Sequence, residues 1–253
     1  MHGISERDLR IVFFDVGGTL AYPHPSFHAL IADVCVRNGV SITAEDAANA
    51  EPAVWERISR REDAGRGYSV SRDRSREFWL WVYRAFLEEV GHPREARGDL
   101  PERLLETFLR LESYRLFSDA LPTLERLHTS GLRLGVISNW EEWLERLLVS
   151  LGVAQHFDAI AVSGVCGFEK PDQAIFLQAL EVAGVAPEQA VHVGDSLRDD
   201  VEGAEAVGIR GVLLERNTPS VARIESPLAP GAHPRISTLR ELPGLLGFEQ
   251  SRG

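Results

Sequence analysis

The sequence predicts an α/β fold in which a doubly wound, parallel, Rossmann-like sheet forms the core and an all-helical cap domain is inserted into it. Five short apolar runs with little alternation are typical of parallel strands that are buried on both faces. Helical patterns of ordinary length separate the later runs, which indicates βαβ units. Between the first two runs, nearly a hundred residues carry only helical patterns, and a simple crossover needs far fewer.

The individual elements follow from apolar spacing and from turn residues. Strands are expected at 11–14, 132–137, 159–162, 191–193 and 211–214. Core helices are expected at 141–151, 172–183, 200–207 and 239–246, and insert helices at 27–38, 44–61, 71–90 and 101–111. This organisation predicts a core domain made of residues 1–21 and 117–253, a cap domain over 22–116, and a Pro- and Ser-rich loop over 217–234.

Composition limits the class of protein. The chain has 253 residues and a formal net charge of −11, which argues against broad binding to nucleic acids or membrane surfaces but not against a small anionic ligand. Cys35 and Cys166 are far apart and in no Cys-x-x-Cys spacing, so we expect free thiols in a reducing compartment. No signal-peptide pattern is visible, and no apolar run approaches the roughly 20 residues that span a bilayer. We expect a soluble cytoplasmic protein.

Polar or charged groups follow each of the first four expected strands. They are Asp15, then Ser138 with Asn139, then Lys170 after a loop, and finally Asp195 with Asp199 and Asp200. Each group alone has an ordinary interpretation as a turn or helix-cap residue. Because ligands of doubly wound sheets bind beyond the carboxyl ends of the strands, the four groups together indicate one ligand site at that edge.

Lys170 is the only lysine of the chain, against 26 arginines. An ammonium is a compact point charge and a guanidinium is a wide planar fork, so a site that holds one small cation between a carboxylate and a phosphate oxygen favours lysine. Carboxylates gathered at one point repel each other unless a cation lies among them, and Mg²⁺ prefers such oxygen ligands together with substrate phosphate. Phosphoryl transfer needs an electrostatic clamp of this kind, and an aspartate can be the nucleophile.

The ordered set of motifs resembles the haloacid dehalogenase-like superfamily, and within it the phosphatases that carry a helical cap. The motifs are Asp15–Leu20, Ile137–Asn139, Lys170–Asp172 and Val193–Asp200, followed by the pair Gly203 and Ala204. Their order and spacing match over residues 8–20 and 116–216, and a four-part match is more specific than any single motif. The helical insert matches the position and type of the family's first cap domain.

The resemblance implies a Mg²⁺-dependent phosphatase that acts on a small phosphorylated metabolite through an aspartyl phosphate. The catalytic residues that it implies are the nucleophile Asp15, and Ser138 and Lys170 as partners of the phosphate oxygens. The metal site that it implies consists of Asp15, the backbone carbonyl of Gly17, Asp195 and Asp200 or Asp199. The remaining residues expected to contact the substrate are Gly18, Thr19 and Asn139.

Gly17 departs from the family pattern. In phosphatases of this family the second residue after the nucleophile is usually an aspartate, which protonates the leaving oxygen and then activates the hydrolytic water. General acid–base catalysis contributes about 10²- to 10⁴-fold, so we expect its loss to weaken turnover without abolishing it. Three outcomes stay open: a phosphatase for good leaving groups such as acyl phosphates, a cap residue that supplies the proton, or a non-catalytic or regulatory protein that binds a phosphate ligand.

Two other branches of the superfamily also lack this aspartate. Haloacid dehalogenases need no metal and lack the Gly-Asp pair that Gly194 and Asp195 form here, so a dehalogenase is the weaker alternative. Phosphonatases use a cap lysine, and this insert contains none.

Features of the insert are less specific. A basic stretch at the start of its third helix consists of Arg66, Tyr68, Arg72, Arg74 and Arg76, and it lies beside Trp79 and Trp81. Such a stretch is typical of a solvated helix start, but it could also steer an anionic substrate. His24 and His28 follow the first motif, and either could replace the missing acid or base. Trp140 either lines the entrance to the site or packs beneath the cap.

Overall fold

The computed structural model describes residues 8–60, 67–92, 98–216 and 233–248. Its core is a six-stranded sheet in the order β5-β4-β1-β6-β7-β8, in which every pair of neighbours is parallel. The strands are β1 (Ile11–Phe14), β4 (Arg133–Ser138), β5 (Ala159–Val162), β6 (Ala190–Gly194), β7 (Arg210–Leu214) and β8 (Arg235–Ile236). The predicted doubly wound parallel sheet is confirmed, and β8 adds a strand that the sequence pattern did not reveal.

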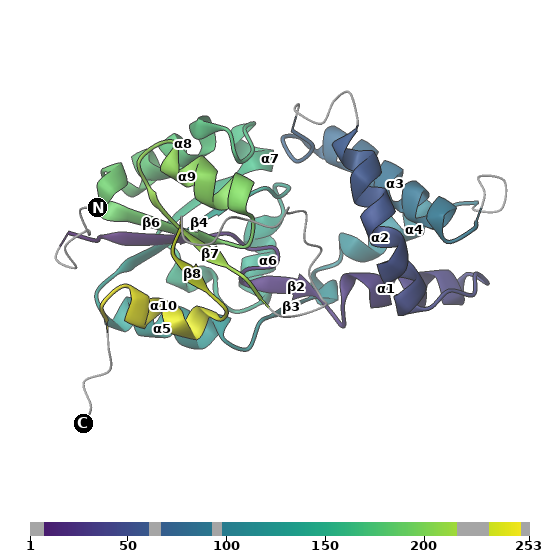
Figure 1. Ribbon diagram of the computed structural model, residues 1–253, viewed down its shortest axis with the longest axis horizontal. Helices are drawn as coiled ribbons and strands as arrows, with labels where there is room; N and C mark the ends of the chain where they lie inside the picture. The colour runs from purple at the N-terminus through teal and green to yellow at the C-terminus, as the bar shows by residue number, and fades with distance from the viewer. Residues whose placement is uncertain (1–7, 61–66, 93–97, 217–232, 249–253) are drawn as a thin grey trace.

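The helices of the core cover both faces of the sheet. They are α5 (Ala120–Thr129), α6 (Leu144–Ser150), α7 (Ser163–Cys166), α8 (Gln173–Ala183), α9 (Gly203–Glu205) and α10 (Leu242–Leu245). Short 3₁₀ turns lie at η2 (Leu111–Ser113), η3 (Ala154–His156), η4 (Pro187–Gln189) and η6 (Leu239–Glu241). Figure 1 shows α8 and α9 on one face and α5 and α10 on the other.

Alternating side chains of β1 enter two separate hydrophobic clusters, one on each face of the sheet. Val12 and Phe14 are fully buried in the cluster that contains residues of α5 and α6, whereas Ile11 and Phe13 are fully buried with residues of α8. Because β1 pairs with β4 on one side and β6 on the other, the carboxyl ends of these three strands lie next to one another.

Between β1 and β4 the chain forms the helices that the sequence predicts in the insert. They are α1 (Phe27–Arg37), α2 (Ala44–Ser59), α3 (Arg72–Glu89) and α4 (Leu100–Phe108). These helices pack around a hydrophobic cluster of their own, in which Val54, Tyr83 and Leu104 are buried. Figure 1 shows this helical insert beside the core. Across the described ranges, none of the helices combines the length and apolar character that a membrane crossing requires.

Side-chain caps explain where the insert helices begin. Ser26, Thr43 and Ser71 each precede a helix, and each accepts a hydrogen bond from a backbone N–H of its first turn. Thr43 and Asp46 form a reciprocal capping box. Such caps satisfy backbone donors that a helix start leaves without partners.

The two ends of the insert also form a short antiparallel ribbon. Its strands are β2 (Ala21–Pro23) and β3 (Tyr114–Leu116). Three residues are too few to show a strand period in the sequence, so the pattern alone did not reveal this pair. The ribbon brings the beginning and the end of the insert together beside the core.

The segment after β6 differs from its prediction. A regular helix was expected over 200–207, but the chain enters a π-helical segment, η5 (Leu197–Glu202), and α9 covers only three residues after it. The expectation was therefore wrong in both the start and the type of helix. The turn brings Asp200 against the end of β6, where a Cβ on Gly194 would lie 2.1 Å from the Asp200 carboxylate. Only glycine leaves room for this approach.

Arg216 follows β7 and fastens the turn after β1 to the rest of the core. Its two terminal nitrogens each donate to a carboxylate oxygen of Asp119, both at 2.9 Å. It also donates to the backbone carbonyls of Gly18 at 3.2 Å and Thr19 at 2.7 Å, and its guanidinium lies 3.8 Å from the ring centroid of Phe117. Burial alone would raise the pKa of Asp119, but hydrogen bonds led by those from Arg216 bring it below its ordinary value. A bidentate contact of this kind requires the planar fork of arginine.

We expect Arg216→Met to lower the free energy of unfolding by about 3–5 kcal/mol, because it leaves the buried carboxylate of Asp119 without its cation. Urea unfolding at neutral pH measures this change. The matched control is Arg103→Met, which removes an exposed pair with Asp99 and should leave the unfolding midpoint unchanged within error. Equal effects of the two substitutions would contradict the anchoring role of Arg216.

Candidate active site

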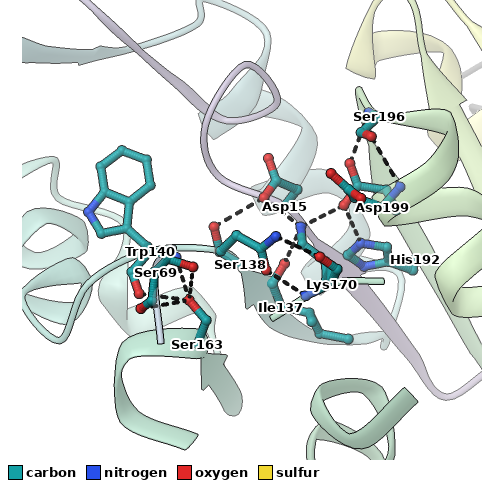
Figure 2. A network of polar contacts seen from close by, with 12 residues as sticks. Asp15, Ser69, Ile137, Ser138, Trp140, Ser163, Lys170, His192, Ser196 and Asp199 are labelled. Carbon is teal, nitrogen blue, oxygen red and sulfur yellow. Dashed lines mark hydrogen bonds and ion pairs between the residues drawn. The ribbon is translucent and has the colours of Figure 1, made fainter. Parts of the chain in front are cut away.

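Polar side chains from several strand ends meet at one edge of the sheet. Asp15 follows β1, Ser138 ends β4, Lys170 lies in the loop after α7, Asp195 follows β6 and Asp200 belongs to η5. All five line one cavity of about 460 Å³, which is within the range of about 300–1,000 Å³ for small-molecule sites. Figure 2 shows Asp15, Ser138 and Lys170 pointing toward one another. The structure thus brings together the groups that the sequence places at strand ends.

Lys170 makes three hydrogen bonds through its ammonium. Its Nζ donates to Oδ1 of Asp15 at 2.8 Å, to Oδ1 of Asp200 at 2.6 Å and to the backbone carbonyl of Ile137 at 3.0 Å. Ser138 Oγ donates to the same oxygen of Asp15 at 3.0 Å. The lysine side chain is 3% exposed, so the only ammonium side chain of the protein is buried between two carboxylates.

Asp200 has further partners that sequence reasoning missed. His192 Nε2 lies 3.0 Å from Asp200 Oδ1, and the backbone N–H of Ser196 donates to Oδ2 at 3.0 Å. Burial lowers the pKa of His192, although its hydrogen bond with Asp200 opposes this shift. The sequence did contain a signal for His192 as a partner of the site, because it is a histidine inside the otherwise apolar run that becomes β6.

The carboxylates of the site differ in how readily they ionise. Burial raises the pKa of Asp15, with Lys170 acting against this shift. Burial, followed by repulsion from Asp15, raises the pKa of Asp195 well above its ordinary value. Burial alone would raise the pKa of Asp200 too, but Lys170 and His192 bring it below its ordinary value. Positive charge therefore reaches Asp200 more effectively than it reaches Asp195.

Three carboxylates could hold a metal ion at this place. One ligand oxygen from each of Asp15, Asp195 and Asp200 lies within 4.8 Å of the others. When ionised, these three groups face the single ammonium of Lys170, which leaves two negative charges without a partner in the described part of the cluster. A divalent cation would balance them, and an all-oxygen donor set suits Mg²⁺. Asp199 lies outside this group, and burial with repulsion from Asp200 raises its pKa to about 6.

Gly17 lines the cavity, and an aromatic ring occupies the space beside it. A Cβ at Gly17 would lie 3.2 Å from Cζ3 and 3.9 Å from Cε3 of Trp140. Trp140 packs in turn against Tyr114 and Trp143, at ring-centroid distances of 5.4 and 5.3 Å. Trp140 therefore both lines the cavity and packs against other rings, and a side chain at position 17 would require its ring to give by a few tenths of an ångström.

The three residues expected to contact substrate lie differently from one another. Gly18 lines the cavity. Thr19 is fully buried and lies outside the cavity lining, so the structure does not bring its hydroxyl to a ligand. Asn139 lines the cavity, but its side chain bonds to the backbone of Lys170, donating to the carbonyl at 2.9 Å and accepting from the N–H at 2.7 Å. Asn139 therefore positions the Lys170 loop, and a contact with substrate stays a prediction.

The helical insert forms the opposite wall of the cavity and is hydrogen-bonded to the core beside Lys170. Ser69 donates to Glu169 Oε2 from its backbone N–H at 2.9 Å and from its hydroxyl at 2.7 Å. The same hydroxyl lies 2.7 Å from Ser163 Oγ, and Figure 2 shows this pair near Trp140. Because Glu169 directly precedes Lys170 in the chain, the insert contacts the same loop that carries the buried ammonium.

In the basic stretch of the insert, Tyr68 lines the cavity, and so does the neighbouring Trp79, whereas the described arginines do not. Arg72 pairs with Glu142, and Arg74 donates to the backbone carbonyl of Gly67. Arg76 is exposed and absent from the cavity wall. Arg66 lies outside the described residues. These arginines therefore fit the interpretation as a solvated helix start.

The two histidines after the first motif also lie away from the cavity wall. His28 is buried against Glu51, with 3.2 Å between His28 Nε2 and Glu51 Oε2. His24 lies near the Tyr22 hydroxyl, at 3.5 Å. The described lining of the cavity includes neither histidine, so the geometry does not support either as the missing acid or base.

Comparisons with known proteins agree with the motifs. The model of the haloacid dehalogenase-like hydrolase family matches residues 9–208. Haloacid dehalogenase-like hydrolase domain-containing protein 3 of Mus musculus is 34% identical over 73% of this chain and 74% of its own length. A phosphoserine phosphatase of Thermus thermophilus is 37% identical over 64% of this chain and 62% of its own length.

Among solved structures, a haloacid dehalogenase-like phosphatase of Thermococcus onnurineus is similar, with a TM-score of 0.61 and 26% identity. The match covers 95% of this chain and 99% of that one. The family match extends over most of the sequence, and its four motifs meet at the cavity edge described above. The chain therefore belongs to the haloacid dehalogenase-like hydrolase family.

Proposed function

We propose that this protein is a Mg²⁺-dependent phosphatase for small phosphorylated metabolites, with the helical insert as its cap domain and Asp15 as its nucleophile. The observation that carries the proposal is the cluster of Asp15, Asp195 and Asp200 around one buried ammonium at the end of the cavity. A divalent cation would balance the charge of this arrangement when the three carboxylates are ionised, and Asp15 lines the cavity where a ligand would lie. Relatives named as phosphatases support the same choice.

Each residue of the cluster has a task in this proposal. Lys170 and Ser138 hold Asp15 in place through one oxygen, and both lie where phosphate oxygens would enter the cavity. Bound Mg²⁺, held by Asp15, Asp195 and Asp200, would supply positive charge for the phosphoryl oxygens. Asp200 would keep its negative charge because Lys170 stays bonded to it. Donors fixed in advance at such a site stabilise a transition state without further rearrangement.

The chemistry proceeds in two displacements at phosphorus. A carboxylate oxygen of Asp15 forms a bond to phosphorus as the bond from phosphorus to the leaving oxygen breaks, and that oxygen keeps the electron pair. Water then attacks the phosphorus of the aspartyl phosphate, which releases phosphate, returns the carboxylate of Asp15 and transfers a proton to solvent. Covalent catalysis of this kind divides one difficult step into two easier ones.

Gly17 limits which substrates can react well. With no acid at this position, the leaving oxygen departs as an anion and takes its proton from water. Substrates whose leaving groups are stable as anions, such as acyl phosphates, then react almost as fast as they would with an acid. Simple alkyl phosphates instead lose most of the roughly 10²- to 10⁴-fold rate contribution of the acid. We therefore propose a phosphatase that is selective for good leaving groups.

We expect the purified protein to release phosphate from 4-nitrophenyl phosphate when Mg²⁺ is present. Asp15→Asn should reduce this rate roughly 10³-fold or more, to background, because it removes the nucleophile. EDTA should abolish the activity and added Mg²⁺ should restore it. The matched control is Asp33→Asn, which changes an exposed aspartate that pairs with Arg37 on α1 and should leave the rate unchanged.

The alternative is a non-catalytic or regulatory protein that binds phosphate or another ligand, and Gly17 is the observation that favours it. Inactivity with 4-nitrophenyl phosphate and acetyl phosphate, together with a rise in melting temperature on adding Mg²⁺ and inorganic phosphate, would support this binder and contradict the phosphatase. Chloride release from 2-chloropropionate without Mg²⁺ would instead support the weaker alternative, a dehalogenase.

Restoring the missing acid should require a change at Trp140 as well. We expect Gly17→Asp alone to raise activity only slightly, because the new side chain meets the ring of Trp140. Combined with Trp140→Phe, whose ring is smaller, it should raise kcat/KM for glycerol 2-phosphate by about 10²-fold. The gain for 4-nitrophenyl phosphate should be much smaller, since its leaving group needs no proton.

Trp140→Phe alone is the control, and it should not raise the rate for the alkyl phosphate. Melting temperatures of all variants identify those that fail to fold. If a folded double variant gains nothing with either substrate, the residue at position 17 is not what limits turnover. That result would argue against the selectivity proposed above.

A further inference from the structure

We infer that the substrates of this cavity are phosphate esters of phenols, with an uncharged aromatic ring held by the insert. The inference rests on the proposed phosphatase function and adds the class of leaving group. It is carried by the chemistry of the cavity wall beyond Asp15, where aromatic rings predominate and unpaired cations are lacking in the part that the structure describes.

Aromatic side chains make up most of the wall that faces the carboxylates. The insert contributes Tyr22, Phe27, Trp55, Tyr68, Trp79, Tyr83, Phe108 and Tyr114, and the adjoining part of the core contributes Trp140 and Trp143. Large flat apolar faces of this kind bind rings of a ligand by stacked or edge-to-face contact. The wall is therefore suited to an aromatic group.

The rings are fixed by packing on one another. Tyr83 stacks on both Trp79 and Phe108, with ring-centroid distances of 5.9 and 5.5 Å. Tyr68 stacks on Phe78 at 4.2 Å. A wall fixed before the ligand arrives loses little side-chain entropy on binding. The wall can therefore bind a flat ring without rearranging its own side chains.

Charge on the wall disfavours a second anionic group on the substrate. Among the described lining residues, the cations are Lys170 and Arg216. Lys170 is bound to carboxylates of the site, and Arg216 is bound to Asp119. Glu141 is a lining residue that contacts the insert through Ser75, and it would repel a carboxylate. A phosphorylated acid would therefore place its carboxylate in an aromatic wall without a cation to meet it.

The missing acid at Gly17 points independently to the same class. A phenol ionises at a pKa of about 10, as tyrosine does, whereas water, which resembles a simple alcohol, ionises at about 15.7. A phenolate can therefore leave without the proton that an aspartate at position 17 would have supplied. An aryl phosphate therefore suits both ends of the cavity, because its leaving group needs no acid at position 17 and its ring can pack against the aromatic wall.

A cationic leaving group is the main competitor, because aromatic faces and a carboxylate also attract ammonium ions. Two observations weigh against it. Both carboxylate oxygens of Glu141 already accept hydrogen bonds, one from Ser75 and one from Trp143. The alcohols that carry such ammonium groups are also poor leaving groups, and position 17 carries no acid that could protonate them.

The test compares kcat/KM for phenyl phosphate, cyclohexyl phosphate, phosphoserine, phosphocholine and acetyl phosphate, in the presence of Mg²⁺. We expect phenyl phosphate to exceed phosphoserine and phosphocholine by about 100-fold or more. Trp79→Leu should lower kcat/KM for phenyl phosphate about 10-fold, mainly through KM, and leave acetyl phosphate within about 3-fold, since acetyl phosphate has no ring to lose contact. Trp81→Leu, a substitution on the same helix at a residue outside the cavity lining, is the matched control and should change neither.

The outcomes distinguish a failure of this inference from a failure of the proposed phosphatase function. If acetyl phosphate and all the esters are inert, the proposed phosphatase fails. If acetyl phosphate reacts but phenyl phosphate is no better than phosphoserine or phosphocholine, the aromatic leaving group is overturned while the phosphatase stands. Equal losses in Trp79→Leu for phenyl and acetyl phosphate would also overturn it, because they would indicate a general disturbance of the site.

Discussion

The site depends on the hydrogen bonds that the ammonium of Lys170 donates. One nitrogen bonds to Asp15 after β1, to Asp200 in η5 and to the backbone of Ile137 in β4, so it ties three neighbouring elements at the carboxyl edge of the sheet. A buried carboxylate without a partner is costly, and Asp15 and Asp200 avoid that state by sharing this cation. The position of the Lys170 loop therefore determines whether the carboxylates can gather at all.

Two groups from different parts of the chain set that position. Asn139, at the end of β4, makes a pair of hydrogen bonds with the backbone of Lys170. Ser69, from the insert, makes two to the carboxylate of Glu169, the preceding residue. The wall that faces the ligand and the cation that orders the carboxylates are thus joined through two adjacent residues. A movement of the insert away from the core would have to break the contacts with Glu169 first.

Sequence reasoning succeeded where a residue was distinctive in the chain itself. Five strands of the sheet were predictable because strands buried on both faces are continuous apolar runs, whereas the two residues of β8 are too few to form such a run. Lys170 was conspicuous as a single lysine. Arg216 has a comparable anchoring role, but as one of 26 arginines it gave no such signal. The contact between Trp140 and Gly17 and the π-helical turn that places Asp200 depend on tertiary packing, which one-dimensional spacing does not contain. Asn139 was found, yet its main partner is the backbone of Lys170 instead of open cavity.

Gly17 and Trp140 are best understood as one feature of the site. A glycine at position 17 lets the indole come close to the turn after Asp15, and the indole belongs to the aromatic packing that continues through Tyr114 and Trp143. The Cβ of an aspartate there would lie 3.2 Å from the ring, and its charged form would lose hydration against that apolar surface. The site therefore has apolar surface where a proton donor would otherwise stand. In the phosphatase that we propose, this feature would favour a substrate whose leaving group contacts the aromatic wall and departs without a proton.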